Sequence, residues 1–283
     1  MGDHPEHRSA GSQNTTQLNQ ADLLDDSGFR AVCWRDEFEP MAYIPESLWD
    51  DVQTAGLVLP TTHALQLACF SEALSLGSAL EAVFQDLTLR WHKQSRLPAW
   101  RNEAFAVHSA GATHPRFRLE RIAARHLGFR TGAVHVNGLS ADGRTMWLAR
   151  RSMAKDSDPG LLDNMVSGGV SAGEPIEQCL WRECWEEAGI QASGEEAALF
   201  HSGLRPLRCL HIQGVEGLGG PWPHIRRERI YAFSLELPSG FVPSNQDGEV
   251  SEYLSVDRAR LRHLIAEGAL TRDAAIVAGL WLA

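Results

Sequence analysis

The sequence lacks several patterns that mark particular classes of protein. No apolar run is long enough to span a bilayer, and the N-terminus lacks the charged-then-apolar pattern of a signal peptide. No Lys/Arg-rich run stands out, and the net charge of −10 argues against nucleic acid or an anionic membrane as the main partner. The five cysteines form no CxxC pair, and their odd number suits free thiols in a reducing compartment. We therefore expect a cytoplasmic protein that binds neither membrane nor nucleic acid.

The length of 283 residues allows one large domain or two modest ones. Residues 1–24 are polar and without pattern, which predicts a disordered tail. Residues 25–125 predict a smaller α+β domain: short strands are expected at 29–34 and 56–59, and apolar residues recur at helical spacing over 65–92.

The second half of the chain predicts a larger α/β unit. Residues 133–151 read as a β-hairpin closed by an Asp-Gly turn. Strands are expected at 204–212 and 229–237, on either side of a loop rich in glycine and proline. The segment 258–282 predicts one or two helices that cover the sheet.

The most informative stretch runs from Ser167 to Ile190, SGGVSAGEPIEQCLWRECWEEAGI. A proline suits a helix start and a glycine suits a left-handed helix stop, so residues 175–188 predict one helix. Three glutamates then fall at i, i+3 and i+4 and share one face, while apolar residues at every fourth position form another. An ordinary solvated acidic helix is the competing interpretation, but it requires this spacing to arise by accident.

Carboxylates held this close repel one another unless a positive charge lies among them. A hard divalent cation with oxygen ligands meets this need, so we expect Mg²⁺, with Mn²⁺ as an alternative. Arg182 is placed to pair with Glu174 or Glu183 and to hold the loop against the helix.

The spacing of Gly168, Glu174 and the run that begins at Arg182 resembles the Nudix box, the signature of metal-dependent hydrolases of diphosphates joined to another group. The resemblance implies an α/β/α sandwich with a mixed β-sheet over residues 126–283, after the smaller α+β domain. It also implies a hydrolase in which water attacks a phosphoanhydride phosphorus. The implied metal ligands are Glu183, Glu186, Glu187 and the backbone carbonyl near Gly168, and the implied catalytic group includes Glu174 and Arg182.

A later segment, Asn245 to Val250, resembles an Asn-x-Asp-Gly-Glu-Val signature of one Nudix subfamily. In Nudix enzymes a carboxylate from this part of the fold often completes the metal site or acts as base. This singles out Glu249, and a solvated loop glutamate is the alternative. The resemblance leaves the base open between Glu183 and Glu249.

Further stretches resemble the Nudix subfamily related to thiamine pyrophosphokinase, whose members carry an N-terminal extension domain. They are Leu97–Glu103, Leu119–Ile122, Ala133–Gly138 and Lys155–Gly169. The resemblance implies that the substrate is thiamine diphosphate, or an oxidised and damaged analogue of it, cleaved to the monophosphate and phosphate. No residue in the sequence identifies a thiazole or pyrimidine ring.

Several residues outside the box are candidates for contact with the substrate. Arg150, Arg151 and Lys155 follow the hairpin and have the charge to meet phosphate oxygens, although solvation of a strand end is an equal alternative. Trp222 in the Gly/Pro-rich loop is a candidate ring contact, together with His224. Trp181 and Trp185, four residues apart, predict packing against the N-terminal domain or a second subunit.

Three other functions remain open. The enzymatic alternative is a pyrophosphatase of ADP-ribose, dinucleotides or nucleotide sugars. A non-catalytic Nudix sensor of a phosphorylated metabolite belongs to a different class, and the intact glutamate cluster argues against it. Diphosphate isomerisation calls for a reactive cysteine outside the box, which the sequence does not suggest. A homodimer is the default assembly for such enzymes.

Overall fold

The computed structural model describes most of the chain beyond the first segment. The described residues are 28–34, 37, 39–60, 68–70, 77–98, 100–109, 112, 114–155, 157–217 and 220–283. The tail predicted for residues 1–24 lies outside them. In the described part of the chain, every helix is too short or too polar to cross a bilayer.

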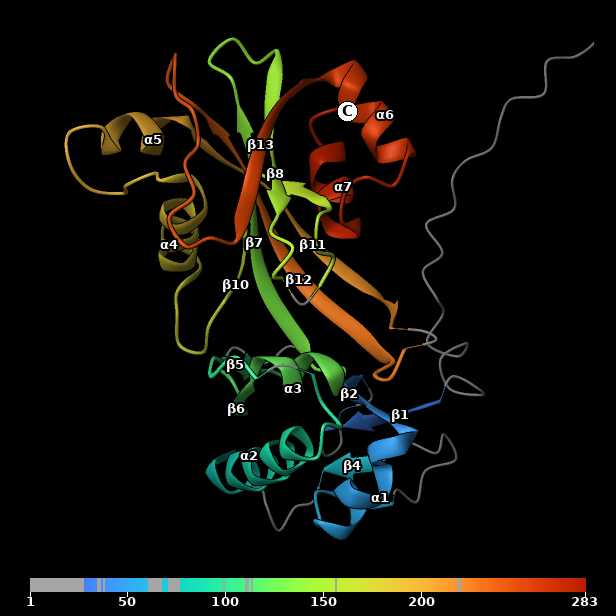
Figure 1. Cartoon of the computed structure of the whole chain (residues 1–283). Helices are drawn as coiled ribbons and strands as arrows, with labels where there is room; N and C mark the ends of the chain where they lie inside the picture. Colours follow the sequence, from blue (N-terminus) through green and yellow to red (C-terminus); the bar gives the residue numbers. More distant parts are fainter. Residues whose placement is uncertain are drawn as a thin grey trace, which may run out of the picture.

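The N-terminal unit contains a small sheet with the strand order β2-β1-β4-β3 and a separate β5-β6 hairpin (Figure 1). Its elements are β1 (Phe29–Cys33), β2 (Pro40–Pro45), α1 (Glu46–Thr54), β3 (Val58–Pro60), β4 (Ala68–Phe70), α2 (Gly77–Lys93), β5 (Ala104–Val107), β6 (Phe117–Glu120) and α3 (Arg121–His126). The two strands predicted at 29–34 and 56–59 are therefore present, the second shifted by one to two residues.

The helical spacing over 65–92 predicts one long helix or two helices broken near Gly77. Helix α2 confirms the part from Gly77 onwards, and residues 65–67 and 71–76 lie outside the described residues. Residues 68–70 form β4 instead, which pairs with β1 in parallel and with β3 in antiparallel register. This pairing supplies backbone hydrogen-bond partners from distant parts of the chain, so tertiary contacts override the local helical spacing. The prediction failed because the periodicity carries no information about such partners.

Aromatic side chains form much of the core of the N-terminal unit. The rings of Phe84, Phe117 and Phe129 lie 5.3–5.7 Å apart, and Trp91 of α2 is fully buried. This core continues to Leu127, so helix α3 is anchored in it at its C-terminal end.

The larger unit is built on a mixed sheet with the strand order β11-β12-β7-β8-β13, in which β10 also pairs with β7 and β9 with β8. Only β12 and β7 run parallel; the other pairs are antiparallel. Its elements are β7 (Arg130–Leu139), β8 (Thr145–Arg151), β9 (Leu162–Asn164), β10 (Val166–Gly169), α4 (Ile176–Ala188), α5 (Ala197–Gly203), β11 (Leu204–Glu216), β12 (His224–Glu236), β13 (Val250–Asp257), α6 (Arg258–Ala266) and α7 (Arg272–Gly279). The predicted hairpin, both later strands and the C-terminal helices are confirmed.

Helices cover both faces of this sheet (Figure 1). On one face, Leu180 and Cys184 of α4 belong to the same core cluster as Val134 and Val136 of β7. On the other face, α7 contributes Val277 to a cluster with strand β12, and α6 joins a third cluster with β8 and β13. The predicted α/β/α sandwich with a mixed sheet is therefore present.

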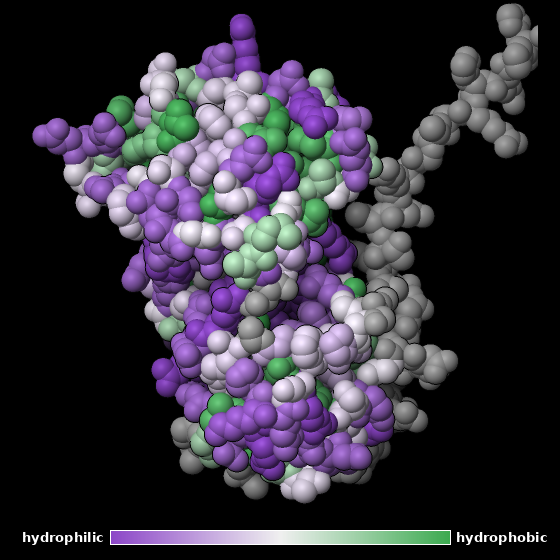
Figure 2. Space-filling model, viewed as in Figure 1, coloured by the Kyte–Doolittle hydropathy of each residue, from purple (hydrophilic) through white to green (hydrophobic). Residues whose placement is uncertain are grey.

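The two units meet along β2, β12 and α3. Tyr43 and Ile225 pack together in a small apolar cluster across the border, and Arg227 Nη1 donates to the carbonyl of Met41 at 3.1 Å. Arg130 at the start of β7 pairs with Glu39 at 2.6 Å. Figure 2 shows that hydrophilic residues predominate on the viewed face, including around the junction of the two lobes.

Candidate active site

Helix α4 carries the box residues and has the predicted ends. It begins at Ile176 directly after Pro175 and ends before Gly189, which adopts a left-handed conformation with φ 71°. Glycine reaches this conformation without the steric cost that other residues carry. The helix is therefore fixed at both ends, and its glutamates have a defined position relative to strand β10.

Two of the three box glutamates are buried against β10. The side chain of Glu183 lies directly over Gly168: a Cβ atom added to this glycine would be 1.8 Å from the Glu183 carboxyl carbon. Glu187 Oε2 accepts a hydrogen bond from the Ser167 amide at 2.7 Å. Glu183 and Glu187 are 8% and 4% exposed, whereas the Glu186 side chain is 35% exposed. Ser167 and Gly168 thus form the floor against which the carboxylates lie.

The environment of these two carboxylates disfavours negative charge. Burial raises the pKa of Glu183, against the opposing charge of Arg182. Burial likewise raises the pKa of Glu187 well above its usual range, and the neighbouring Glu183 raises it further. A cation bound among them would reverse this effect, because opposite charge favours the ionised form.

Arg182 satisfies both of the pairings expected for it. Its Nε and Nη2 atoms donate to the two oxygens of Glu174 at 2.8 and 2.9 Å. Its Nη1 atom donates to Glu183 at 2.7 Å and to Glu186 at 2.9 Å. The bidentate bond fixes the guanidinium plane. Glu174 therefore orients Arg182, and Arg182 draws Glu183 and Glu186 toward one point.

The donor set suits a hard divalent cation by its chemistry. Carboxylate and backbone oxygens gather around Ser167 and Gly168, and the repulsion between Glu183 and Glu187 calls for a positive charge. However, no group of three Asp, Glu, His or Cys side chains within the described ranges converges as a ready-made metal site. Arg182 is the cation that Glu183 and Glu186 contact in this structure.

The loop before β13 is shaped to present Glu249. Asn245 Oδ1 accepts from the Gly248 amide at 3.2 Å, its Nδ2 donates to the carbonyl of Val250 at 3.0 Å, and Asp247 accepts from the Glu249 amide at 2.8 Å. These bonds account for the Asn-x-Asp-Gly-Glu pattern as a loop motif.

The Glu249 side chain forms an ion pair with Lys155. Burial raises the pKa of Glu249, but the hydrogen bond and charge of Lys155, with the charges of Arg121 and Arg101, lower it overall. Glu249 is therefore held as a carboxylate at the rim of the box.

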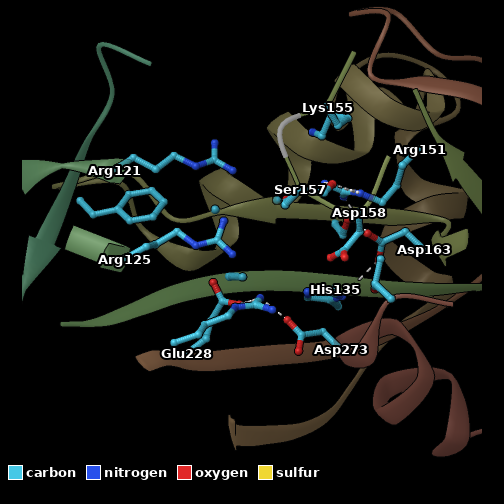
Figure 3. Close-up of a pocket in the computed structure, with 17 residues that line it drawn as sticks. Arg121, Arg125, His135, Arg151, Lys155, Ser157, Asp158, Asp163, Glu228 and Asp273 are labelled. Atoms are coloured by element: carbon cyan, nitrogen blue, oxygen red, sulfur yellow. Dashed lines mark hydrogen bonds and ion pairs between the residues drawn. The ribbon is translucent and has the colours of Figure 1, made fainter. Parts of the chain in front are cut away.

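A cavity of about 490 Å³ lies between α3, the β11–β12 turn and the segment around Lys155. Arg151, Lys155, Trp222 and His224 line it together with Glu249, so all of the substrate-contact candidates except Arg150 are brought together. It adjoins a second cavity, which reaches Ser167, Gly168 and Gly169 of the box and shares part of the same lining (Figure 3).

Arg150 is engaged elsewhere. Its Nε atom donates to Glu252 at 2.7 Å and its Nη1 atom to the carbonyl of Gly160 at 3.0 Å, and it lines neither of these two cavities. Successive side chains of a strand point to opposite faces, which separates Arg150 from Arg151. The sequence could not choose between the two because the strand register was not known.

The expected packing of Trp181 on the N-terminal domain is wrong. Trp181 is buried in the α4 face of the sandwich, with its ring 4.5 Å from that of His201 on α5. Trp185 is 41% exposed, and the proposed contact of its ring with a second subunit stays a prediction. The predicted Gly/Pro-rich loop between the later strands is also shorter than expected, because β11 and β12 extend as a hairpin to Glu216 and His224.

Sequence reasoning missed several charged residues that line these cavities. They are Arg121 and Arg125 of α3, Glu103 beside β5, and the buried residues His135, Asp163, Glu228 and Asp273. Glu103 and Arg121 fall within stretches that carry the subfamily resemblance, but no role was assigned to them. The signal that marks them is their shared position around the two cavities, which only the fold provides.

Comparison with known proteins identifies the family. The NUDIX domain model matches residues 129–274, which is more than half of the chain. The chain therefore belongs to the Nudix family, whose members act on phosphoanhydride substrates and generally use divalent metals.

Two curated relatives come from Arabidopsis thaliana. The chain is 32% identical over 179 residues to "Nudix hydrolase 24, chloroplastic", covering 62% of this chain and 46% of the relative. It is 33% identical over 171 residues to "Nudix hydrolase 20, chloroplastic", covering 60% of this chain and 43% of the relative. The chain thus spans less than half the length of the curated relatives it matches. A crystal structure of a Deinococcus radiodurans protein is 21% identical, with a TM-score of 0.46, over 62% of this chain and 96% of that one.

Proposed function

We propose that the protein is a Mg²⁺-dependent hydrolase that cleaves a phosphoanhydride. The observation that carries the proposal is the burial of Glu183 and Glu187 against Gly168 and Ser167, which line a cavity that also contains Arg121, Arg125, Arg151 and Lys155. Two buried carboxylates that repel each other are costly unless a cation joins them. Arg182, held by Glu174, keeps the cluster converged.

In this proposal Glu183, Glu186 and Glu187 hold the metal, with the Gly168 carbonyl as a further ligand. A bound divalent cation acidifies water and neutralises charge on a diphosphate. The chain's own residues then bind and orient the anion. Arg151 and Lys155 line the cavity beside the carboxylates, and the backbone of β10 limits how closely the anion can approach them. Trp222 and His224 line the far end, where they suit a ring attached to the diphosphate.

The substrate we propose is thiamine diphosphate or an oxidised analogue such as oxothiamine diphosphate, cleaved to the monophosphate and orthophosphate. This choice rests on the subfamily resemblance, and the cavity supports it by its size and by its mixture of cations with an indole and two imidazoles. Hydrolysis of ADP-ribose, dinucleotides or nucleotide sugars is the enzymatic alternative, because the same features accept other ring-bearing diphosphates.

Two carboxylates are candidates for the base. Glu183 lies over Gly168 and doubles as a ligand, whereas Glu249 is paired with Lys155 at the rim. Glu183→Gln and Glu249→Gln separate these roles when turnover and Mn²⁺ binding are both measured. If one of these glutamates is the base and not a metal ligand, its Gln variant should lose turnover while binding Mn²⁺ within about twofold of wild type.

The first test is orthophosphate release with Mg²⁺ from thiamine diphosphate, oxothiamine diphosphate, ADP-ribose and nucleotide sugars. We expect release from the thiamine compounds, lost in Glu186→Gln and kept in Glu177→Gln, an exposed glutamate on the same helix. Release that requires added phosphatase would instead assign the enzyme to the nucleotide-sugar or dinucleotide class, since those products are monophosphates.

A non-catalytic Nudix sensor is the second candidate, and one observation favours it. The described residues contain no preformed group of three metal-ligating side chains, and Arg182 contacts Glu183 and Glu186. If no compound is turned over and a diphosphate still raises the melting temperature of the protein, the sensor hypothesis is supported.

Location and assembly are part of the proposal. The proposed cytoplasmic location rests on the odd number of cysteines without a CxxC pair, which suits a reducing compartment, and the proposed homodimer rests on the default assembly of such enzymes. Fractionation of the native protein and light scattering of the purified chain test them.

A further inference from the structure

The N-terminal unit is attached directly to the Nudix box. Arg121 Nη1 donates to Glu103 Oε2 at 2.8 Å, and Glu103 Oε1 accepts from Ser171 Oγ at 2.7 Å. The backbone repeats this contact, because the Ala172 amide donates to the carbonyl of Ala104 at 2.7 Å. Ser171 and Ala172 belong to the loop that opens the box. The position of Arg121 is therefore tied to the loop that leads into the carboxylate helix.

Arg121 lies against the glycine pair of β10. Its guanidinium carbon is 5.5 Å from the centroid of the Phe105 ring, and a Cβ added to Gly169 would come within 2.7 Å of that ring and 3.8 Å of the guanidinium carbon. Burial lowers the pKa of Arg121, but Glu103, Glu183 and Glu249 raise it overall, so the box carboxylates act on this side chain. Arg121 thus faces the site of the proposed chemistry.

Arg125 lies one helical turn further on and points into the same cavity (Figure 3). Its guanidinium forms no ion pair or hydrogen bond with any residue that the structure describes. Besides burial, the nearby charge of Glu228 favours the ionised form, and the charges of Arg226 and Arg121 disfavour it. Burial lowers its pKa, yet a guanidinium stays charged. A buried guanidinium without a direct hydrogen bond or ion pair is costly even with carboxylates nearby, and an anionic ligand would supply the missing bond.

The lining of the cavity between the two units has a positive net charge, although the protein as a whole is negatively charged. The cavity of about 490 Å³ has five cationic side chains and three carboxylates, whereas the chain has a net charge of −10. The cations are Arg101, Arg121, Arg125, Arg151 and Lys155, and the carboxylates are Glu103, Glu216 and Glu249. Such a local reversal of sign attracts anions into the cleft.

We propose that Arg121 and Arg125 of the N-terminal unit bind the phosphate groups of the substrate, so that this unit completes the active site of the Nudix domain. The proposal rests on the proposed function for the identity of the substrate as a diphosphate. Glu103 is a positioning residue, which holds Arg121 toward the box and joins it to Ser171. Lys155 and Arg151 approach the same anion from the Nudix side.

The test is calorimetric binding of methylenediphosphonate, a diphosphate analogue with a carbon bridge, to the full chain with Mg²⁺. Arg125→Gln is the main variant, since its side chain has no described partner to disrupt. Loss of a charged hydrogen bond predicts binding weaker by roughly tenfold to a hundredfold. Arg125→Lys should recover part of the affinity. Arg121→Gln should weaken binding to a similar degree.

The matched control is Arg118→Gln, an exposed arginine of the same unit that pairs with Glu81 and should bind within about twofold of wild type. Melting temperatures of all variants exclude loss of fold. Affinity unchanged in both Arg125→Gln and Arg121→Gln, or no binding by the wild-type chain, would overturn the proposal. If binding depends on the two arginines but no test compound is turned over, the proposal of an anion site is upheld and the proposed hydrolase function is rejected.

Discussion

The two walls of the cleft carry opposite charge and are built in different ways. One wall is the box, where Glu183 and Glu187 are buried against β10. The other is the border of the N-terminal unit, where Arg121 and Arg125 project from a helix of six residues. The acidic wall is local in sequence, since its residues fall within 24 positions between Ser167 and Ile190. The basic wall also includes cations from distant segments, namely Arg101, Arg151 and Lys155.

Under the proposed function, this difference corresponds to a division of tasks within one site. A cluster of carboxylates needs fixed spacing to hold a metal, and a helix packed on a strand supplies that spacing. An anion-binding wall needs only charge at the right distance, which side chains of several elements can provide. A change in the first wall should therefore affect turnover strongly, and a change in the second should affect mainly substrate binding.

The largest effect is expected from the acidic wall. Glu187→Gln keeps the shape of the side chain but removes a charge at a position that is 4% exposed and bonded to the Ser167 amide. We expect kcat to fall at least about 100-fold, since even residues that merely orient metal ligands cost 10- to 100-fold. Phosphate release across a Mg²⁺ titration measures this, with Glu177→Gln as control. A loss smaller than tenfold would contradict the assignment of Glu187 as a ligand.

The second prediction concerns the close packing of Glu183 over Gly168 in the acidic wall. In Gly168→Ala the new methyl group would lie 1.8 Å from the Glu183 carboxyl carbon, so the glutamate or the strand must move. We expect a loss of stability of about 1–3 kcal/mol, as for overpacked cores, together with loss of turnover.

Chemical denaturation and the phosphate assay measure the two effects of Gly168→Ala. Gly279→Ala is a suitable control, because a Cβ there meets nothing within 4 Å. Wild-type stability in Gly168→Ala would show that Glu183 moves aside freely and that the acidic wall is not rigid.

The contrast between the walls also explains what the sequence could reveal. The box helix, its ends and the pairing of Arg182 with Glu174 and Glu183 followed from residues within one stretch, because local spacing sets helix faces and caps. The pairing of β4 with β1 did not follow, and neither did the position of Arg125, because both depend on contacts between distant segments. Arg150 and Arg151 were equivalent in sequence and became different only when the register of β8 was known.

A pH-dependent prediction concerns the basic wall. Burial, followed by the positive charge that His224 can carry, lowers the pKa of His126 to about 4, and the two rings lie 4.2 Å apart. An unfolded histidine titrates near 6.5. Between these values the unfolded chain binds more protons, so the stability contributed by neutral His126 is complete above about pH 6.5 and falls as the pH decreases toward 4.

The expected slope from this group is at most about 1.4 kcal/mol per pH unit, and solvent around the partly exposed ring reduces it. Urea unfolding of wild type and His126→Gln at several pH values isolates the contribution, since other groups cancel in the difference. The stability of wild type relative to the variant should decline from pH 6.5 to 4. If the difference in unfolding free energy between wild type and His126→Gln does not change with pH, the His126 ring must be open to protons and water in the folded protein.

The smallest effect is expected at Arg150. Its guanidinium is bound to Glu252 and to the carbonyl of Gly160, away from the two cavities, so Arg150→Ala should change KM by less than about twofold. Lys155→Ala removes a cation that lines both cavities and pairs with Glu249, and should raise KM by roughly tenfold. Steady-state kinetics of the two variants on one substrate compare them directly. If Arg150→Ala raised KM as much as Lys155→Ala, the anion would contact the other side of β8, and the basic wall would need to be extended beyond the border of the two units.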